Sequence, residues 1–99
     1  MRAVRDLLPN LLERFGLAEG VAGWRAVHEW PEVVGERVAR RTRAIRFDQG
    51  VLLVEVDGSA WLQELGFLKR ELISQINRHL GSNQVRQLHF VMSRGGSQR

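Results

Sequence analysis

A change of hydrophobic period near the middle of the chain constrains the fold more than any other feature of the sequence. On either side of the triplet DQG at residues 48–50, the apolar residues alternate with period two: Ile45, Phe47, Leu52, Val54 and Val56. Such alternation indicates half-buried strands, and a glycine in a short link supplies the positive φ that a hairpin turn needs. The sequence therefore predicts a β-hairpin, with Ala44 and Arg46 on the face opposite Ile45 and Phe47.

A long amphipathic helix is predicted from about residue 60 to residue 80, with Ser59 as its N-cap and Gly81 placed to end it. One apolar stripe recurs at helical spacing: Trp61, Leu65, Leu68, Leu72, Ile76 and Leu80. Phe67 points to the polar side of this helix. Lys69 falls inside the apolar arc, where its stem can lie along the stripe while the ammonium reaches the rim.

The remaining pattern predicts helices before the hairpin and one strand after the long helix. Apolar residues at helical spacing cover residues 4–15, 21–28 and 30–41, and alternation over 85–92 predicts a third strand. A helix long enough for a crossover lets the second and third strands lie parallel in one sheet, side by side or through a central neighbour. The predicted fold class is α+β, in two layers: helices cover one sheet face, and the other face stays partly open. That open face is predicted to carry Ala44, Arg46, Val51, Leu53, Glu55, Gln87 and His89.

Length and composition bound the organisation of the chain. With 99 residues, 43% of them hydrophobic, the chain can build one modest core. We expect a single domain over residues 1–92, followed by a short disordered tail at 93–99. No stretch approaches the length of a membrane span, and without cysteine there is neither a disulfide nor a thiolate site. A cytoplasmic, nucleoid-associated location with no membrane contact is expected.

The sequence offers little for catalysis. His28, His79 and His89 fall on separate predicted elements, with no acidic residue at a ligand-like spacing. The serines occupy cap, helix-surface, turn and tail positions, and no glycine-rich phosphate loop follows a strand. We therefore expect no enzyme activity, no cofactor and no metal.

A dense group of arginines is the strongest candidate site. The formal net charge is +4, and fourteen of the fifteen cationic side chains are arginine. Five of them lie within ten residues, with only Glu36 nearby to neutralise them: Arg37, Arg40, Arg41, Arg43 and Arg46. Guanidinium groups suit phosphate, so this arginine cluster is predicted to bind nucleic acid with a steep salt dependence. A solvated face in an arginine-biased proteome is the alternative.

The large aromatic residues divide into two groups. Trp24, Trp30 and Trp61 each join an apolar stripe and are interpreted as core anchors, although one of them could stack on single-stranded bases. Phe67 is different, because its helical neighbours are polar. An exposed ring beside Arg70 and Arg78 has the composition of an interface hot spot. We therefore predict a partner-binding surface of Phe67, Arg70, Arg78 and Trp61.

Several of these segments together resemble the bacterial DciA family. The segments, in order, are WPEVVGERVARRTR, DQGVLLVEVDGSAWLQEL, FLKRELISQINRHLG and VRQLHF. The resemblance implies a KH-like α+β domain and a role in loading or operating the DnaB-type replicative helicase, with affinity for single-stranded DNA. Trp30, Trp61 and Phe67 match aromatic positions of the family. The Gly-x-x-Gly loop of KH domains is missing, so nucleotide clamping in the usual KH manner is not expected.

Two other functions remain open from the sequence. A KH-like RNA-binding module is the first alternative, and competition between DNA and RNA of equal length would separate it from a replication factor. The second is an oligomerisation domain, in which the open sheet face or Phe67 pairs two chains into a homodimer. Solution mass, measured with and without Phe67→Ala, would test that alternative.

Overall fold

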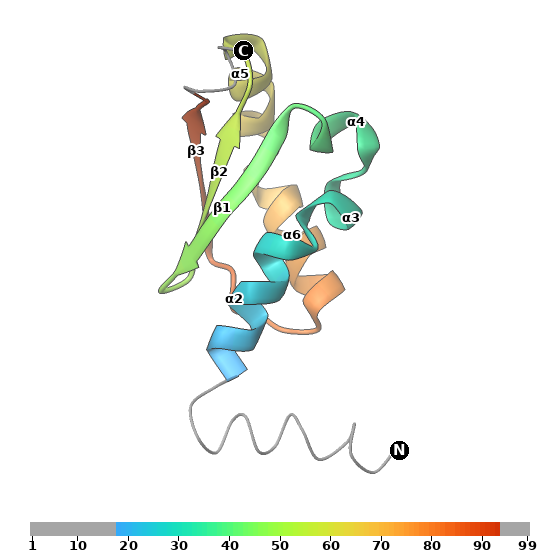
Figure 1. Ribbon diagram of the computed structural model, residues 1–99. Coiled ribbons are helices and arrows are strands. Elements are labelled where there is room, and N and C mark those ends of the chain that lie inside the picture. The colour runs from blue at the N-terminus through green and yellow to red at the C-terminus, as the bar shows by residue number, and fades with distance from the viewer. Residues whose placement is uncertain (1–17, 94–99) are drawn as a thin grey trace.

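The computed structural model describes residues 18–93. Five helices and three strands make up this part of the chain (Figure 1). The helices are α2 (Ala18–His28), α3 (Trp30–Val34), α4 (Glu36–Ala39), α5 (Ser59–Phe67) and α6 (Lys69–Leu80), and the strands are β1 (Thr42–Asp48), β2 (Val51–Val56) and β3 (Gln87–Met92). The predicted helix over 4–15 and the tail beyond Ser93 lie outside the described residues.

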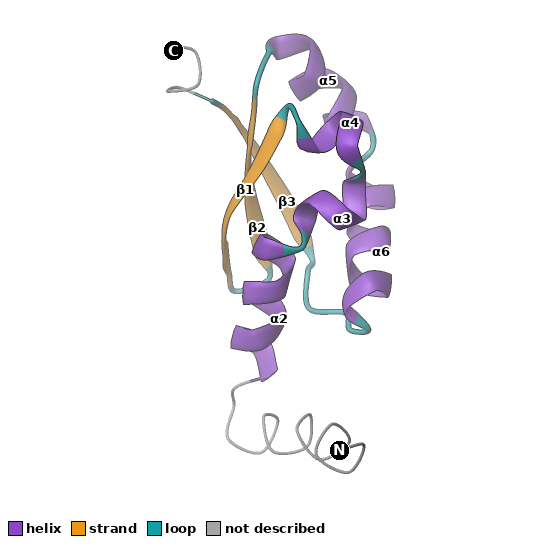
Figure 2. Cartoon of the chain, turned by 45° about the vertical axis from the view of Figure 1, so that its right-hand side comes forward, coloured by secondary structure: helices purple, strands orange, loops and turns teal. Residues whose placement is uncertain are grey.

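The three strands form one mixed sheet in the order β1-β2-β3. β1 pairs antiparallel with β2, and β2 pairs parallel with β3 after the crossover through α5 and α6. The described helices lie on one side of this sheet, as Figure 2 shows. The α+β class is therefore confirmed. Of the two arrangements that the sequence left open for the second and third strands, the structure has the direct parallel pair.

The hairpin turn is also confirmed. Gln49 has φ 49° and Gly50 has φ 86°, so both residues of the link are left-handed, which suits the twist of the flanking strands. The guanidinium of Arg86 lies against Gly50, where a Cβ would stand 2.9 Å from Nε of Arg86. Any side chain at position 50 would therefore be both strained and crowded.

A β-bulge in β1 corrects the predicted facing of one residue. Ala44 pairs with Val54 and Arg46 pairs with Leu53, so Ile45 is an extra residue between them. Ala44 therefore shares the helix-covered face with Phe47, and both pack against the core. The prediction that Ala44 lies on the open face is wrong, because strict alternation does not allow for an inserted residue.

Two predicted helices are each divided in the structure. Leu68 (φ −102°, ψ 9°) separates α5 from α6, and its N–H donates to the carbonyl of Leu65 at 3.0 Å, one residue short of an α-helical bond. Gly35 (φ 89°, ψ 162°) likewise separates α3 from α4. The N-cap of α5 is Gly58 rather than Ser59, and no side chain caps this end. Gly81, with φ 70° and ψ 33°, ends α6 as predicted.

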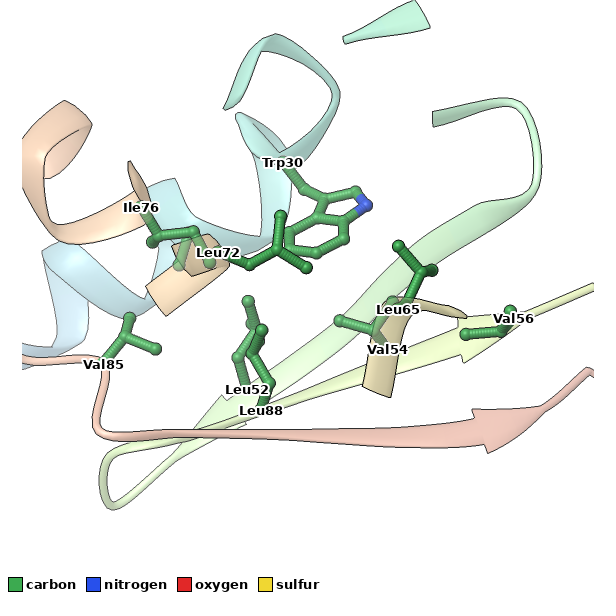
Figure 3. Packing of buried hydrophobic residues seen from close by; sticks show 10 residues of the cluster. Trp30, Leu52, Val54, Val56, Leu65, Leu72, Ile76, Val85 and Leu88 are labelled. Atoms are coloured by element: carbon green, nitrogen blue, oxygen red, sulfur yellow. The ribbon is translucent and has the colours of Figure 1, made fainter. Parts of the chain in front are cut away.

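The core lies between the sheet and the helices. Trp30 is 1% exposed and lies in the helix layer above the sheet residues of the core (Figure 3). Buried side chains from both layers and from the loop after α6 complete the cluster: Ala26, Leu52, Val54, Val56, Leu65, Leu72, Ile76, Val85 and Leu88. Trp30 is therefore a core anchor, as the sequence indicated.

Candidate nucleic-acid and partner-binding surfaces

Four residues of the arginine cluster lie where α4 passes into β1 (Figure 1), and Arg46 lies further along β1, two residues before the strand ends. Arg37 belongs to α4, Arg40 and Arg41 follow it, and Arg43 and Arg46 lie on β1; all five are exposed. Three arginines of the cluster line a shallow groove. The groove is lined by Arg40, Arg41 and Arg43 together with Thr42, Glu55, Asp57 and Ser93. The fold thus gathers three of the five arginines on one hollow surface.

Trp30 and Thr42 fix the position of this surface. The indole Nε1 of Trp30 donates to the hydroxyl of Thr42 at 2.8 Å, and that hydroxyl donates to the carbonyl of Val38 at 2.8 Å. The first residue of β1 is thereby tied both to the core and to α4. Hydrogen bonds between partly buried groups contribute about 1 kcal/mol each, so the arginine cluster sits on a defined backbone.

The fold supplies the cluster with more carboxylates than the sequence suggested. Arg40 pairs with Glu36 at 3.6 Å, as the helical spacing predicts, but Arg41 also pairs with Asp57 at 3.3 Å and Arg43 with Glu55 at 3.9 Å. The expectation that only Glu36 neutralises the cluster is therefore wrong. The antiparallel pairing places Glu55 opposite Arg43, and Asp57 donates its N–H to the carbonyl of Arg41.

The pairs of Arg40 with Glu36 and of Arg41 with Asp57 are exposed and therefore weak. The side chains of Arg40 and Glu36 are 72% and 84% exposed, and those of Arg41 and Asp57 are 54% and 58% exposed. Exposed pairs contribute about 0–1 kcal/mol, because water screens them and two long side chains must be held in place. The arginines can exchange these carboxylates for the phosphates of a ligand at little cost.

Phe67 is exposed, as the sequence indicated. It is the last residue of α5, and 79% of its surface is accessible. It lines a hollow with Ala60, Gln63, Glu64 and Leu68. Leu68 is itself 37% exposed, so the break between α5 and α6 presents two neighbouring apolar side chains.

The four residues of the predicted partner surface do not line one common hollow. Arg70 and Arg78 line a groove along α6 and the turn after it, with Ile73, Ser74, Asn77, Gly81, Ser82 and Asn83. Trp61 is half-buried, and the guanidinium carbon of Arg37 lies 5.6 Å from its ring centroid. Trp61 is thus joined to the arginine cluster, and Phe67 lines a different hollow from the two arginines.

Trp24 is an exposed aromatic residue that the sequence analysis assigned to the core. It is 60% exposed, and its ring lies 4.4 Å from the ring of His28. Small residues form the buried face of α2 instead, because a Cβ at Gly23 would stand only 2.5 Å from Cδ2 of Phe47. The sequence signal for this buried face is the helical spacing of Gly23 and Ala26, and it is a weak signal.

A partly buried ion network joins α2 to α6. The guanidinium of Arg25 donates to both carboxylate oxygens of Glu29, at 3.1 and 3.0 Å, and Nε2 of His79 lies 2.7 Å from Oε1 of the same residue. The hydrogen bonds from Arg25, and then that from His79, hold the pKa of Glu29 below its usual value. The bond to Glu29 raises the pKa of Arg25.

Two members of this network, together with Glu32, form the one group of potential metal ligands among residues 18–93. Glu29, Glu32 and His79 offer ligand atoms within 4.8 Å of one another. Spacing along the sequence gave no sign of this group, because His79 lies 50 residues from Glu29. Arg25 already occupies both oxygens of Glu29, so a cation there would have to displace a guanidinium. We interpret the network as a structural link.

No helix within the described part of the chain is long and apolar enough to cross a membrane. Residues 18–93 define the class of small α+β domains with a mixed three-stranded sheet, here with arginines at one end and exposed aromatic residues on α2 and α5.

Sequence comparison places the chain in a particular family. Residues 3–90 match the family model described as "Dna[CI] antecedent, DciA", and the chain belongs to this family. The family description associates the chain with DNA replication in bacteria. The resemblance drawn from the sequence is thereby confirmed.

Several similar proteins carry the name UPF0232 protein. The one from Streptomyces avermitilis is 38% identical over 98% of this chain and 54% of its own length. That from Streptomyces coelicolor is 38% identical over 90% of this chain and 48% of its own, and that from Mycobacterium tuberculosis H37Rv is 30% identical over 83% and 44%. The chain thus spans about half the length of these relatives.

Proposed function

We propose that this chain is a non-enzymatic DNA-replication factor that binds the DnaB-type replicative helicase and single-stranded DNA and promotes helicase loading. The observation that carries the proposal is the match to the DciA family over residues 3–90. The factor acts by binding energy alone, in the cytoplasm and at the nucleoid. No cofactor takes part.

The arginine cluster supports the DNA-binding part of the proposal. Its exposed arginines line a groove, and their weak pairs with carboxylates can be exchanged for phosphates. The half-buried ring of Trp61, next to Arg37, provides an aromatic surface at the same end of the domain. Aromatic rings beside arginines hold single strands with little dependence on sequence.

Phe67 supports the helicase-binding part. Large apolar patches on a small domain mark interaction sites, and the exposed Phe67 and Leu68 are adjacent at a helix break. Arg70 and Arg78 lie on the helix that follows this break and extend the proposed surface along α6. The ring of Phe67 serves as the anchor of the contact.

Titration against the same organism's replicative helicase tests this function. Wild type should bind saturably, and Phe67→Ala should weaken binding by at least about tenfold, the loss typical of a hot-spot aromatic. Trp24→Ala is the matched control, since it removes an exposed aromatic from another helix and should leave the affinity within about threefold.

Solution mass should be measured for both variants, so that a lost homodimer is not mistaken for a lost helicase contact. If Phe67→Ala binds like wild type, the helicase interface lies elsewhere. If wild type does not bind the helicase at all, the helicase part of the proposal is wrong.

A further inference from the structure

Within residues 18–93, strand β3 has a partner strand on one side only. It pairs with β2 alone and lies at the margin of the sheet (Figure 1). The N–H of Gln87 donates to the carbonyl of Gly50 at 3.0 Å, and the N–H of Ser93 donates to that of Val56 at 2.8 Å. Because peptide groups alternate along a strand, the odd-numbered residues from 87 to 93 face β2. The even-numbered residues must face the other way.

Leu88, Phe90 and Met92 therefore direct both N–H and C=O away from β2. Within residues 18–93, these peptide groups have no hydrogen-bond partner. An edge strand of this kind is a template for another extended chain, because its donors and acceptors alternate as those of a second strand do.

Lys69 and Arg86 line one hollow next to the start of β3, and Lys69 also lies close to the strand itself. A hollow between α6 and the start of β3 is lined by Val51, Lys69, Ile73, Arg86, Gln87, Leu88 and His89, with no carboxylate among them. Nζ of Lys69 lies 5.7 Å from the ring centroid of Phe90, which holds the ammonium over β3. Lys69 therefore brings a positive charge next to β3.

We propose that the free edge of β3 accepts an extended acidic peptide segment of a partner protein as a fourth strand. Main-chain bonds to Leu88, Phe90 and Met92 would supply the affinity, and Lys69 would select acidic side chains. This inference does not depend on the proposed DNA or helicase binding.

Charge and bonding pattern favour a peptide over other occupants. Phosphates accept hydrogen bonds but donate none, so the phosphate groups of a nucleic acid would leave the three carbonyls of this edge unpaired. A second copy of this chain paired β3 to β3 about a two-fold axis would bring Lys69 of each copy to the same edge, where the like charges repel.

The experiment uses the full chain labelled with ¹⁵N and an end-capped peptide of alternating Glu and Thr. The peptide should bind saturably and should slow hydrogen exchange at the amides of Leu88, Phe90 and Met92. The same peptide methylated on every backbone nitrogen keeps its charge but loses its donors, and it should bind at least about tenfold more weakly. Replacing its Glu residues by Lys should have an effect of similar size.

A variant of the protein, rather than of the peptide, also tests whether the edge of β3 binds the peptide. Met92 is 46% exposed, and Met92→Pro removes a donor from the free edge while the bonds of β3 to β2 remain. It should weaken peptide binding at least about tenfold, whereas Met92→Ala should stay within about threefold. A thermal unfolding curve close to that of wild type shows that the fold is kept, and the methylated peptide tests the proposal without altering the protein.

Several results would overturn the proposal. Equal binding of the methylated peptide would show attraction by charge alone, and absence of peptide binding would remove the site. Slow exchange of the three amides in the free protein would show that a second copy or another segment of this chain already occupies the edge. Protection of these amides by oligothymidine rather than by the peptide would assign the edge to nucleic acid.

Discussion

Two groups of ion pairs in this domain contain the same residue types, arginine and glutamate, in different surroundings. In the arginine cluster, the pair of Arg40 with Glu36 is 3.6 Å long and both side chains are mostly exposed. Between α2 and α6, the pair of Arg25 with Glu29 is 3.0 Å long, and the two side chains are only 36% and 25% exposed. His79 adds a second contact to Glu29 there.

The difference shows that burial, and not the number of charges, decides what an ion pair does. The pair of Arg25 with Glu29 is less exposed to water and salt, and the contact of His79 with the same Glu29 links the end of α2 to α6. The exposed pairs contribute little to stability, which leaves their arginines free to exchange partners. One group therefore supports the fold, and the other is suited to binding.

The largest expected effect is a loss of DNA affinity when arginines of the cluster are replaced. Replacing Arg40, Arg41 and Arg43 together by Ala should lower the affinity for fluorescein-labelled oligothymidine at least about tenfold at low salt, and should reduce the slope of log affinity against log salt by about 2. Fluorescence anisotropy at several salt concentrations measures both quantities.

The control for this experiment removes arginines from α6. Arg70→Ala combined with Arg78→Ala should leave the DNA affinity within about threefold of wild type. Equal losses per arginine removed in the two variants would mean that only net charge matters. An unchanged affinity and salt slope in the triple variant would contradict the DNA-binding role of the cluster, and competition with RNA of equal length tests the choice of nucleic acid.

The partly buried network should contribute measurably to stability. Glu29→Gln removes charged hydrogen bonds and should lower the free energy of unfolding by about 1–2 kcal/mol near neutral pH, as measured by urea denaturation. The matched control, Glu36→Gln in the exposed pair, should cost less than about 0.5 kcal/mol. Equal costs would break the distinction between the two groups.

The stabilisation from Glu29 should also depend on pH. Folding lowers the pKa of this carboxyl, mainly through the hydrogen bonds from Arg25, so its contribution is present above the unfolded pKa and is lost as the pH falls through the folded value. The difference between wild type and Glu29→Gln should therefore shrink below the reference pKa of 4.5. A difference that persists at lower pH would contradict this assignment.

The smallest expected effect tests the exchange of carboxylates for phosphate. Glu55→Gln with Asp57→Asn frees Arg43 and Arg41 from their partners and should raise the DNA affinity about twofold to fivefold at low salt. Glu64→Gln with Glu71→Gln makes the same change of charge on α5 and α6 and should raise it less. A larger gain in that control would show that the arginines do not meet phosphate at this groove.

Much of the fold follows from periodicity. The hairpin, the third strand and the end of α6 at Gly81 were predictable because each depends on local pattern or on a glycine with positive φ. The parallel pairing of β2 with β3 was only one of two arrangements that the crossover allowed. The breaks at Gly35 and Leu68 were not predictable, since the apolar spacing continues across both. Strict alternation also gave no sign that Ile45 is the extra residue of a bulge.

The candidate surfaces were predictable only in part. The exposure of Phe67 follows from helical phase, and the arginine cluster is visible in the sequence itself. Its neutralisation by Glu55 and Asp57, and the contact of His79 with Glu29, depend on residues that only the tertiary fold brings together. Trp24 was misassigned because a large aromatic in an apolar stripe is usually buried, whereas here Gly23 and Ala26 form the buried face.

The close seating of α2 on β1 links two positions distant in the sequence. Because a Cβ at Gly23 would stand 2.5 Å from the ring of Phe47, the volume at one position limits the volume at the other. Related chains with alanine or serine at position 23 should carry a smaller side chain at position 47. We expect these two positions to co-vary in size across the family, and an alignment of full-length members would show it as a reciprocal pattern of residue volumes.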